Sequence, residues 1–245
     1  MSAVALVFLY ALLTALATGL GAIPFAFVRT ISVRFLATAN ALAAGLMLGA
    51  SFGLVAEGTT YGGVETVAGA LLGVGFILGA QRYLGDPHED GMIPGMAAGG
   101  DRRRMVLMLV VMTVHSFSEG VAVGVSFGGG ITLAALITVA IAIHNIPEGV
   151  AITAVLRPQG VSIAKCAGWS IVSSLPQPLM AVPAYLFVDA FSQALPYGLG
   201  FAAGAMIFMV LVELLPEAFG HGGRATVATL ASAATIAMVL FQRLL

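Results

Sequence analysis

Two polar motifs with the same spacing stand in otherwise apolar stretches of this chain. The first is HSFSEG at residues 115–120, and the second is HNIPEG at residues 144–149, twenty-nine positions further on. In each motif the histidine and the glutamate are four residues apart, so on a helix both side chains project from one face, about one turn from each other. An imidazole and a carboxylate placed in this way can bind a metal cation together, or they can pair with neighbouring helices.

The composition around these motifs is that of a polytopic membrane protein. Of 245 residues, 60% are hydrophobic and 9% are charged, and the 31 glycines suit closely packed membrane helices. With Cys166 as its single cysteine, the chain forms neither an intramolecular disulfide nor a multi-cysteine metal site. The net charge of −1 gives no argument about nucleic acid, and we expect no nucleic-acid partner. We interpret the N-terminus as the first spanning helix, because it lacks the basic region and cleavage site of a removed signal peptide.

Windows of about 20 apolar residues predict eight spanning helices. Their predicted ranges are 3–28, 36–57, 65–84, 104–127, 131–156, 162–188, 193–217 and 223–243. The chain is thus predicted to be one all-α transmembrane domain of residues 1–245, with a cytoplasmic loop at 85–103. Glycine and proline interrupt the apolar pattern around residues 53–63 and 176–183.

The distribution of basic residues predicts the orientation of these helices. Nine of the ten lysines and arginines fall in the odd-numbered connections, and Arg243 falls on the other side. Because basic residues gather on the cytoplasmic side, we expect both termini outside. The sequence AAGLM at 43–47 in the second predicted helix matches AAGAM at 202–206 in the seventh, and these helices run in opposite directions. Together with the two motifs on antiparallel helices, this predicts a 3+2+3 inverted repeat.

The two motif histidines are predicted to share a depth in the bilayer. His115 precedes Gly129 by fourteen residues, and His144 follows it by fifteen. At 1.5 Å per residue, both imidazoles then lie about 21 Å from the glycine turn at 128–130. Pro147 removes one backbone hydrogen bond and should kink the fifth helix beside them.

Two imidazoles and two carboxylates suit Zn²⁺ and similar borderline cations, since these accept nitrogen and oxygen ligands. A single intramembrane histidine more often makes an interhelical hydrogen bond, and a single buried glutamate can be protonated. Two such pairs at one depth on neighbouring helices favour a metal site.

The forms HSxxEG and HNxPEG on the fourth and fifth predicted helices resemble the paired metal-binding signatures of the ZIP family of divalent metal transporters, in a prokaryotic or organellar branch. Eight spans, outward termini and a variable third connection also resemble that family, so the resemblance covers essentially the whole chain. It implies import of Zn²⁺, or of Fe²⁺, Mn²⁺ or Cd²⁺, into the cytoplasm by an elevator-like or rocking motion. It also implies a protein of the inner or plasma membrane that forms a homodimer, with the divalent cation as substrate, the lipid bilayer around it and no organic cofactor.

By position, the resemblance assigns metal ligands within both motifs. It implies that His115, Glu119 and Glu148 are metal ligands. Further ligands from Ser116, His144 and Asn145 would then complete one or two adjoining sites.

Three further residues resemble functional positions of the family, and each has an ordinary alternative. Met47 resembles a second-helix methionine that touches the metal, although helical methionines usually pack. Gln177 stands where one bacterial branch carries a glutamate for a second metal, so it is either an uncharged oxygen ligand or a cap for broken backbone. Glu213 resembles the cytoplasmic end of the transport path, with Val212 in place of a frequent histidine beside it, or it forms an ion pair.

Two other functions could use the same side chains. An intramembrane metal-dependent hydrolase would use these ligands to activate water, but intramembrane metalloproteases are expected to carry HExxH, and neither motif has that order. A proton or anion pathway would use the carboxylates and leave the two matched imidazoles unexplained. We therefore predict a transporter and not an enzyme.

Overall fold

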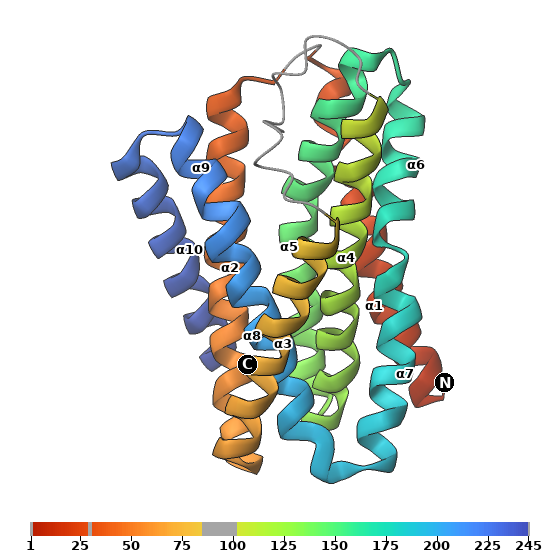
Figure 1. The fold of residues 1–245 in the computed structure, drawn as a ribbon, viewed down its shortest axis with the longest axis vertical. Helices are drawn as coiled ribbons and strands as arrows, with labels where there is room; N and C mark the ends of the chain where they lie inside the picture. Colours follow the sequence, from red (N-terminus) through yellow and green to blue (C-terminus); the bar gives the residue numbers. More distant parts are fainter. Residues whose placement is uncertain (1, 29–30, 85–101, 245) are drawn as a thin grey trace.

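The computed structural model describes residues 2–28, 31–84 and 102–244 (Figure 1). Within these ranges the side chains of residues 84, 102–108 and 111 are not described. The described chain is helical and contains no strand. Its segments are α1 (Ala3–Leu20), η1 (Ile23–Ala26), α2 (Val33–Tyr61), α3 (Gly63–Leu84), α4 (Arg102–Ser126), η2 (Phe127–Gly129), α5 (Ile131–Leu156), η3 (Arg157–Gln159), α6 (Ile163–Ser174), α7 (Pro176–Ala190), η4 (Ser192–Ala194), α8 (Leu195–Met209), η5 (Val210–Leu214), α9 (Leu215–His221) and α10 (Arg224–Leu244).

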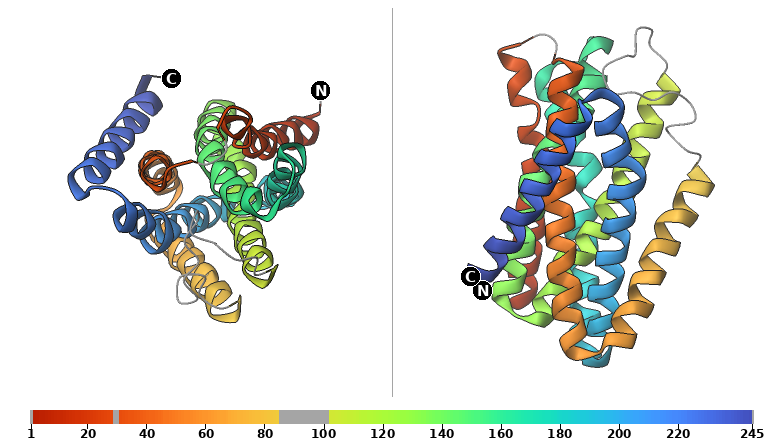
Figure 2. Two further views of the ribbon diagram at one scale, coloured as in Figure 1. Left: turned by 90° about the horizontal axis from the view of Figure 1, so that it is seen from above. Right: turned by 90° about the vertical axis from the view of Figure 1, so that its left-hand side faces the viewer.

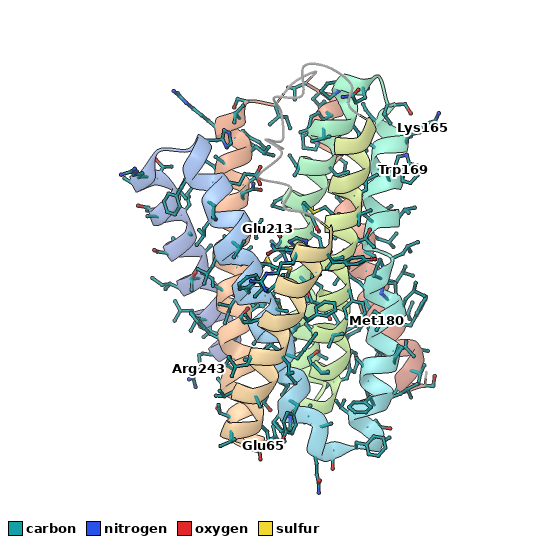
Figure 3. The ribbon with its side chains drawn as sticks, viewed as in Figure 1. Glu65, Lys165, Trp169, Met180, Glu213 and Arg243 are labelled. Atoms are coloured by element: carbon teal, nitrogen blue, oxygen red, sulfur yellow. The ribbon has the colours of Figure 1, made fainter. Side chains whose placement is uncertain are left out.

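The long helices make this an all-α polytopic membrane protein. In the part of the chain that is described, seven segments are long and apolar enough to cross a membrane, and α4 runs alongside them next to α5. Figure 3 shows Lys165 near one end of the molecule, Glu65 at the other end and Glu213 between them. Arg243 lies in the half that contains Glu65, away from Lys165. Which end faces the cytoplasm stays a prediction, and most of the predicted loop 85–103 lies outside the described residues.

Proline breaks two of the predicted helices. The first, predicted for 3–28, ends at Leu20 and is followed by η1, where Pro24 contributes no backbone N–H. The sixth, predicted for 162–188, is divided into α6 and α7, because Pro176 cannot donate to the preceding turn. The proline-rich interruption seen in the sequence is therefore a true break.

The second and seventh predicted helices are longer than expected. The second, predicted for 36–57, continues through its glycines to Tyr61. The seventh, predicted for 193–217, contains the π-helical segment η5 and reaches His221 through α9. A π segment has hydrogen bonds between residues five apart instead of four, so its turn is wider than that of an α-helix, and such segments are frequent at functional sites.

The helices form two bundles that lie side by side (Figure 2, left). The first bundle consists of α1, α4, α5, α6 and α7, and its most extensive contacts are α4 with α7 and α1 with α5. The second bundle consists of α2, α3, α8, η5, α9 and α10, and its most extensive contacts are α3 with α8 and α2 with α10. The bundles meet where α2 packs against α5 and α4 packs against α8.

The helix contacts follow the predicted inverted repeat. In that repeat the spans α1, α2 and α3 correspond to α6–α7, α8–α9 and α10, and α4 corresponds to α5. The contact of α3 with α8 then corresponds to that of α10 with α2, and the contact of α4 with α7 corresponds to that of α5 with α1. Even the contacts between the bundles match, since α2 with α5 corresponds to α8 with α4.

Candidate metal centre

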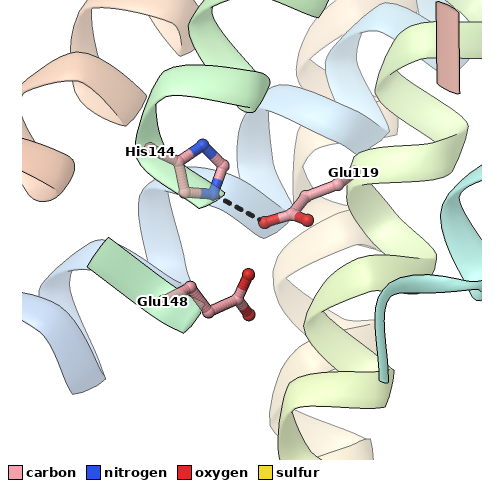
Figure 4. Close-up of side chains that lie close together, drawn as sticks. All are labelled: Glu119, His144 and Glu148. Atoms are coloured by element: carbon pink, nitrogen blue, oxygen red, sulfur yellow. Dashed lines mark hydrogen bonds and ion pairs between the residues drawn. The ribbon is translucent and has the colours of Figure 1, made fainter. Parts of the chain in front are cut away.

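Glu119 on α4 and His144 and Glu148 on α5 form a compact cluster (Figure 4). One ligand atom from each residue lies within 4.8 Å of the other two, and His144 Nε2 is 2.8 Å from Glu119 Oε1. Glu119 is 1% exposed and His144 is 4% exposed, while Glu148 is partly buried. The two motifs therefore meet inside the protein and place two carboxylates and an imidazole in one small volume.

Local helix geometry places these side chains. His144 and Glu148 are one turn apart on α5, so they share a face of that helix. Pro147 lies inside α5 and offers no N–H to the carbonyl one turn earlier. The backbone beside the cluster therefore has a hydrogen-bond acceptor that the helix itself does not satisfy.

The glycine that follows each motif glutamate allows a close helix contact. A Cβ atom at Gly120 would lie 2.5 Å from the Gln177 carbonyl oxygen of α7, and one at Gly149 would lie 1.7 Å from the Thr18 carbonyl oxygen of α1. No side chain fits at such distances. Each Glu-Gly pair thus combines a candidate ligand with a backbone contact, and α7 and α1 are corresponding helices of the repeat.

Gln177 ties α7 and α1 to the cluster through its amide group. Its Nε2 donates to Glu119 Oε2 at 2.5 Å, and its Oε1 accepts from Thr14 Oγ1 at 2.6 Å and from Asn145 Nδ2 at 3.2 Å. Asn145 Nδ2 also donates to the Thr14 carbonyl oxygen at 2.8 Å, which fixes the orientation of both amides. Both sides of the Gln177 amide are therefore hydrogen-bonded, and its nitrogen faces Glu119.

Three buried oxygens on the two motifs have no hydrogen-bond partner among the described residues. They are Ser116 Oγ, Asn145 Oδ1 and Glu148 Oε2. A buried polar atom without a partner is destabilising by about 1–3 kcal/mol. A cation bound among these atoms would satisfy them, and all three are atoms of types that coordinate metals.

His115 lies beside this cluster and contacts the second bundle. Its Nε2 is 2.7 Å from Glu213 Oε2, and Gln81 Nε2 of α3 donates to Glu213 Oε1 at 2.6 Å. The three polar residues line a small cavity together with Ile77, Ala80, Val114 and Met209. The sequence predicted that His115 is a metal ligand and that Glu213 lies at the cytoplasmic end of the transport path. In the structure their side chains contact each other directly.

Met47 lies in the main apolar core and is 2% exposed. Three further residues of these contacts were not identified from the sequence, namely Thr14, Gln81 and Met209. The sulfur of Met209 lies 4.0 Å from Ser118 Oγ. A polar residue inside an apolar span is the signal that could have identified Thr14 and Gln81, because such residues normally face a partner.

The fold and the cluster define a class of polytopic membrane proteins whose spanning helices enclose nitrogen and oxygen atoms of the kinds that bind cations. The sequence profile of the family described as ZIP Zinc transporter matches residues 88–240. This chain belongs to that family. The assignment identifies a transporter, and it gives no support to the alternative of a hydrolase.

Similarity to individual proteins extends beyond the profile match. Zinc transporter ZupT of Corynebacterium glutamicum is 33% identical over 231 residues, which cover 86% of this chain and 88% of that protein. Zinc transporter GufA of Myxococcus xanthus is 33% identical over 224 residues, covering 86% and 87%. A protein of Arabidopsis thaliana, named as a candidate zinc transporter, is 47% identical over 244 residues, which are 98% of this chain. This chain spans 38% of the length of the plant protein.

Proposed function

We propose that this protein carries divalent metal ions across the membrane, with Zn²⁺ as its principal substrate, and that the ion binds between α4 and α5. The observation that carries the proposal is the close approach of Glu119, His144 and Glu148, whose ligand atoms lie within 4.8 Å of one another. Two carboxylates balance the charge of a divalent ion in a setting where an uncompensated charge is very costly. The names of the ZupT and GufA relatives support the choice of zinc.

Neighbouring motif residues complete the coordination in this proposal. Ser116 and Asn145 offer buried oxygens that lack other partners among the described residues. His115 supplies a second imidazole after its side chain turns from Glu213 toward the cluster. Met47 is a further candidate, because it belongs to α2, the helix of the second bundle that contacts α5.

The site holds one ion at a time. A second ion between Glu119 and Gln177 would have to approach Oε2 from the side where the Gln177 amide N–H group points at it. An amide nitrogen has no lone pair to offer a cation. In the proposal, Gln177 therefore orients Glu119 and Asn145 and does not coordinate the metal.

Transport proceeds by movement of the first bundle, which contains the cluster, against the second. Repeats of this kind bind substrate near the membrane midplane and expose it alternately to the two sides. The excess of basic residues in odd connections supports an orientation with both termini outside and import toward the cytoplasm. Glu213 then receives the ion on its way to the cytoplasm. In this proposal the protein lies in the inner or plasma membrane and forms a homodimer.

Zinc uptake into liposomes that contain the full chain tests this function. The unmodified protein is expected to show saturable uptake. Glu148→Gln keeps the side-chain volume but removes a ligand charge, so we expect uptake to fall by about 100-fold or more. Glu65→Gln is the matched control, because Glu65 lies at one end of the second bundle (Figure 3), and its uptake should stay within about twofold.

Circular dichroism and size-exclusion chromatography of each variant separate lost binding from lost folding. A folded Glu148→Gln protein that transports zinc at the unmodified rate would contradict the assignment of the site. Failure of the unmodified chain to take up zinc or any other divalent cation would contradict the proposed function itself.

A further inference from the structure

A contact between a histidine and a glutamate joins the two bundles next to the cluster of Glu119, His144 and Glu148. His115 belongs to the first bundle, and Glu213 and Gln81 belong to the second. The His115 Nε2 to Glu213 Oε2 distance is 2.7 Å, and both side chains are nearly buried, with 9% and 10% exposure. Glu213 lies between the two ends of the molecule in Figure 3. We call this pair the inter-bundle contact.

His115 stands between the cluster and Glu213. It is one helical turn from Glu119 within the same motif, so both side chains project from one face of α4. Yet the close set of ligand atoms comprises Glu119, His144 and Glu148 without it. The imidazole therefore shares a helix face with a cluster residue, but in this arrangement it is directed to the second bundle.

One nitrogen cannot serve both partners. A histidine nitrogen that binds a metal presents a lone pair, whereas a nitrogen that bonds to a carboxylate presents a proton. Nε2 of His115 can thus bind the ion or Glu213, but not the two together.

Glu213 is held on its other side by Gln81. The amide nitrogen of Gln81 donates to Oε1 at 2.6 Å, which leaves Oε2 directed at His115. Glu213 also lies in the π segment η5, whose wider turn departs from regular helical spacing at this point. Three elements, α3, α4 and η5, thus converge on one carboxylate.

We propose that the inter-bundle contact, positioned by Gln81, holds the two bundles together in the metal-free protein and is broken by the metal ion, which competes with Glu213 for His115. This inference rests on the proposed function, because it requires a divalent cation at the cluster. Gln81 is a positioning residue, since it acts through Glu213 and does not touch the ion. Binding of the ion and release of the first bundle from the second are then one event.

A different role for Glu213 makes the opposite prediction. Metal-binding histidines often use one ring nitrogen for the metal and donate the other N–H to a carboxylate, which strengthens metal binding. If Glu213 supported His115 in this way, loosening Glu213 would weaken zinc binding. If Glu213 competes with the metal, loosening it makes His115 available more often and strengthens binding.

The decisive variant is Gln81→Leu, which removes the hydrogen bond to Glu213 and leaves every charge in place. Zinc affinity of the purified full chain is measured by titration against a competing chelator. We expect Gln81→Leu to bind Zn²⁺ about three- to tenfold more tightly than the unmodified chain. The matched control is Gln242→Leu, since the Gln242 amide nitrogen on α10 is buried and lacks a hydrogen-bond partner in the described structure.

A distance measurement tests the mechanical half of the inference. Spin labels at Tyr83→Cys on α3 and Lys165→Cys on α6, in a Cys166→Ser background, report on the separation of the bundles from two exposed positions. Zinc should shift the distance distribution of the otherwise unmodified chain, and Gln81→Leu should show part of that shift without zinc.

Unchanged or weaker zinc binding in Gln81→Leu, relative to Gln242→Leu, would overturn the inference while leaving zinc transport intact. An unaltered distance distribution on addition of zinc would overturn it as well. Lack of saturable zinc binding by the unmodified chain would instead overturn the proposed function on which the inference rests.

Discussion

The two bundles are packed alike but differ in what they bury. In both, glycine brings helix backbones into contact, as at Gly149 against Thr18 in the first and Gly73 against Phe201 in the second. The first bundle also buries hydrogen-bonded polar side chains, namely Thr14, Thr18, Glu119, His144, Asn145, Ser174 and Gln177. The core of the second bundle is largely aliphatic, with Leu54, Leu199 and Met206 fully buried. In the proposed mechanism, the first bundle therefore carries the cluster, and the second bundle is the surface against which it moves.

The contact between the bundles differs from the contacts within them. At several described glycines, an added Cβ atom would lie within 2.5 Å of a backbone atom of another segment. Each of these glycines faces a helix of its own bundle. Between the bundles, Gly198 of α8 instead faces the side chain of Val125 on α4. Backbone contacts at glycine lose their fit when helices slide, whereas side chains can exchange neighbours by changing rotamer. The difference favours movement of each bundle as a unit.

The largest expected effect follows from placing a methyl group at a backbone contact. In Gly149→Ala the new Cβ would lie 1.7 Å from the Thr18 carbonyl oxygen, so α1 and α5 must separate. We expect a loss of about 3 kcal/mol or more in the free energy of unfolding, measured by denaturant titration in detergent micelles, and loss of zinc binding.

Two alanine variants sharpen this comparison. Gly204→Ala creates a similar clash in the second bundle, 2.1 Å from the Ala70 carbonyl oxygen, and should destabilise the protein while its folded fraction keeps its zinc affinity. A Cβ at Gly75 meets nothing within 4 Å, so Gly75→Ala should leave stability unchanged or raise it by about 0.5–1 kcal/mol. Equal zinc affinity in folded Gly149→Ala and Gly204→Ala would contradict the division of roles between the bundles.

A smaller effect is expected when the amide that orients Glu119 becomes a carboxylate. Gln177→Glu replaces the donor at Glu119 Oε2 by an oxygen ligand, and like charges this close repel unless a cation lies between them. We expect the number of zinc ions bound per chain to rise from about one to about two, as counted by metal analysis after equilibrium dialysis. Gln242→Glu adds the same charge to the second bundle and should leave the count at one. Two ions bound by the unmodified chain would refute the single-ion site.

Much of this architecture could be predicted from the sequence, because it follows from local patterns. The length of the apolar stretches predicted the spanning helices. The four-residue spacing within each motif predicted that His144 and Glu148 share a helix face. The contacts then agree with the inverted repeat that matching segments and antiparallel motifs had suggested. The π segment around Glu213 and the break before Pro176 altered the course of two spans that apolar length alone could not resolve.

The partners of the polar side chains could not be predicted in the same way. Thr14 and Gln177 are 163 positions apart, and no local pattern relates them. Helical spacing likewise fixes the face on which His115 projects, but not whether its ring turns to the cluster or across the bundle boundary to Glu213. These contacts depend on how helices pack, so they become visible only in three dimensions.

The smallest effect is expected when one interhelical hydrogen bond is removed from each bundle. Thr18 Oγ1 lies 2.8 Å from Ser174 Oγ in the first bundle, and Thr235 Oγ1 donates to the Gly45 carbonyl oxygen at 3.1 Å in the second. Hydrogen bonds between membrane helices contribute about 0.6 kcal/mol on average, so Thr18→Val and Thr235→Val should each lower stability by about that amount in detergent unfolding. Zinc uptake should change less than about twofold in both, because neither hydroxyl contacts the cluster. A selective loss of uptake in Thr18→Val would show that the functional polar network extends along α1 beyond Thr14.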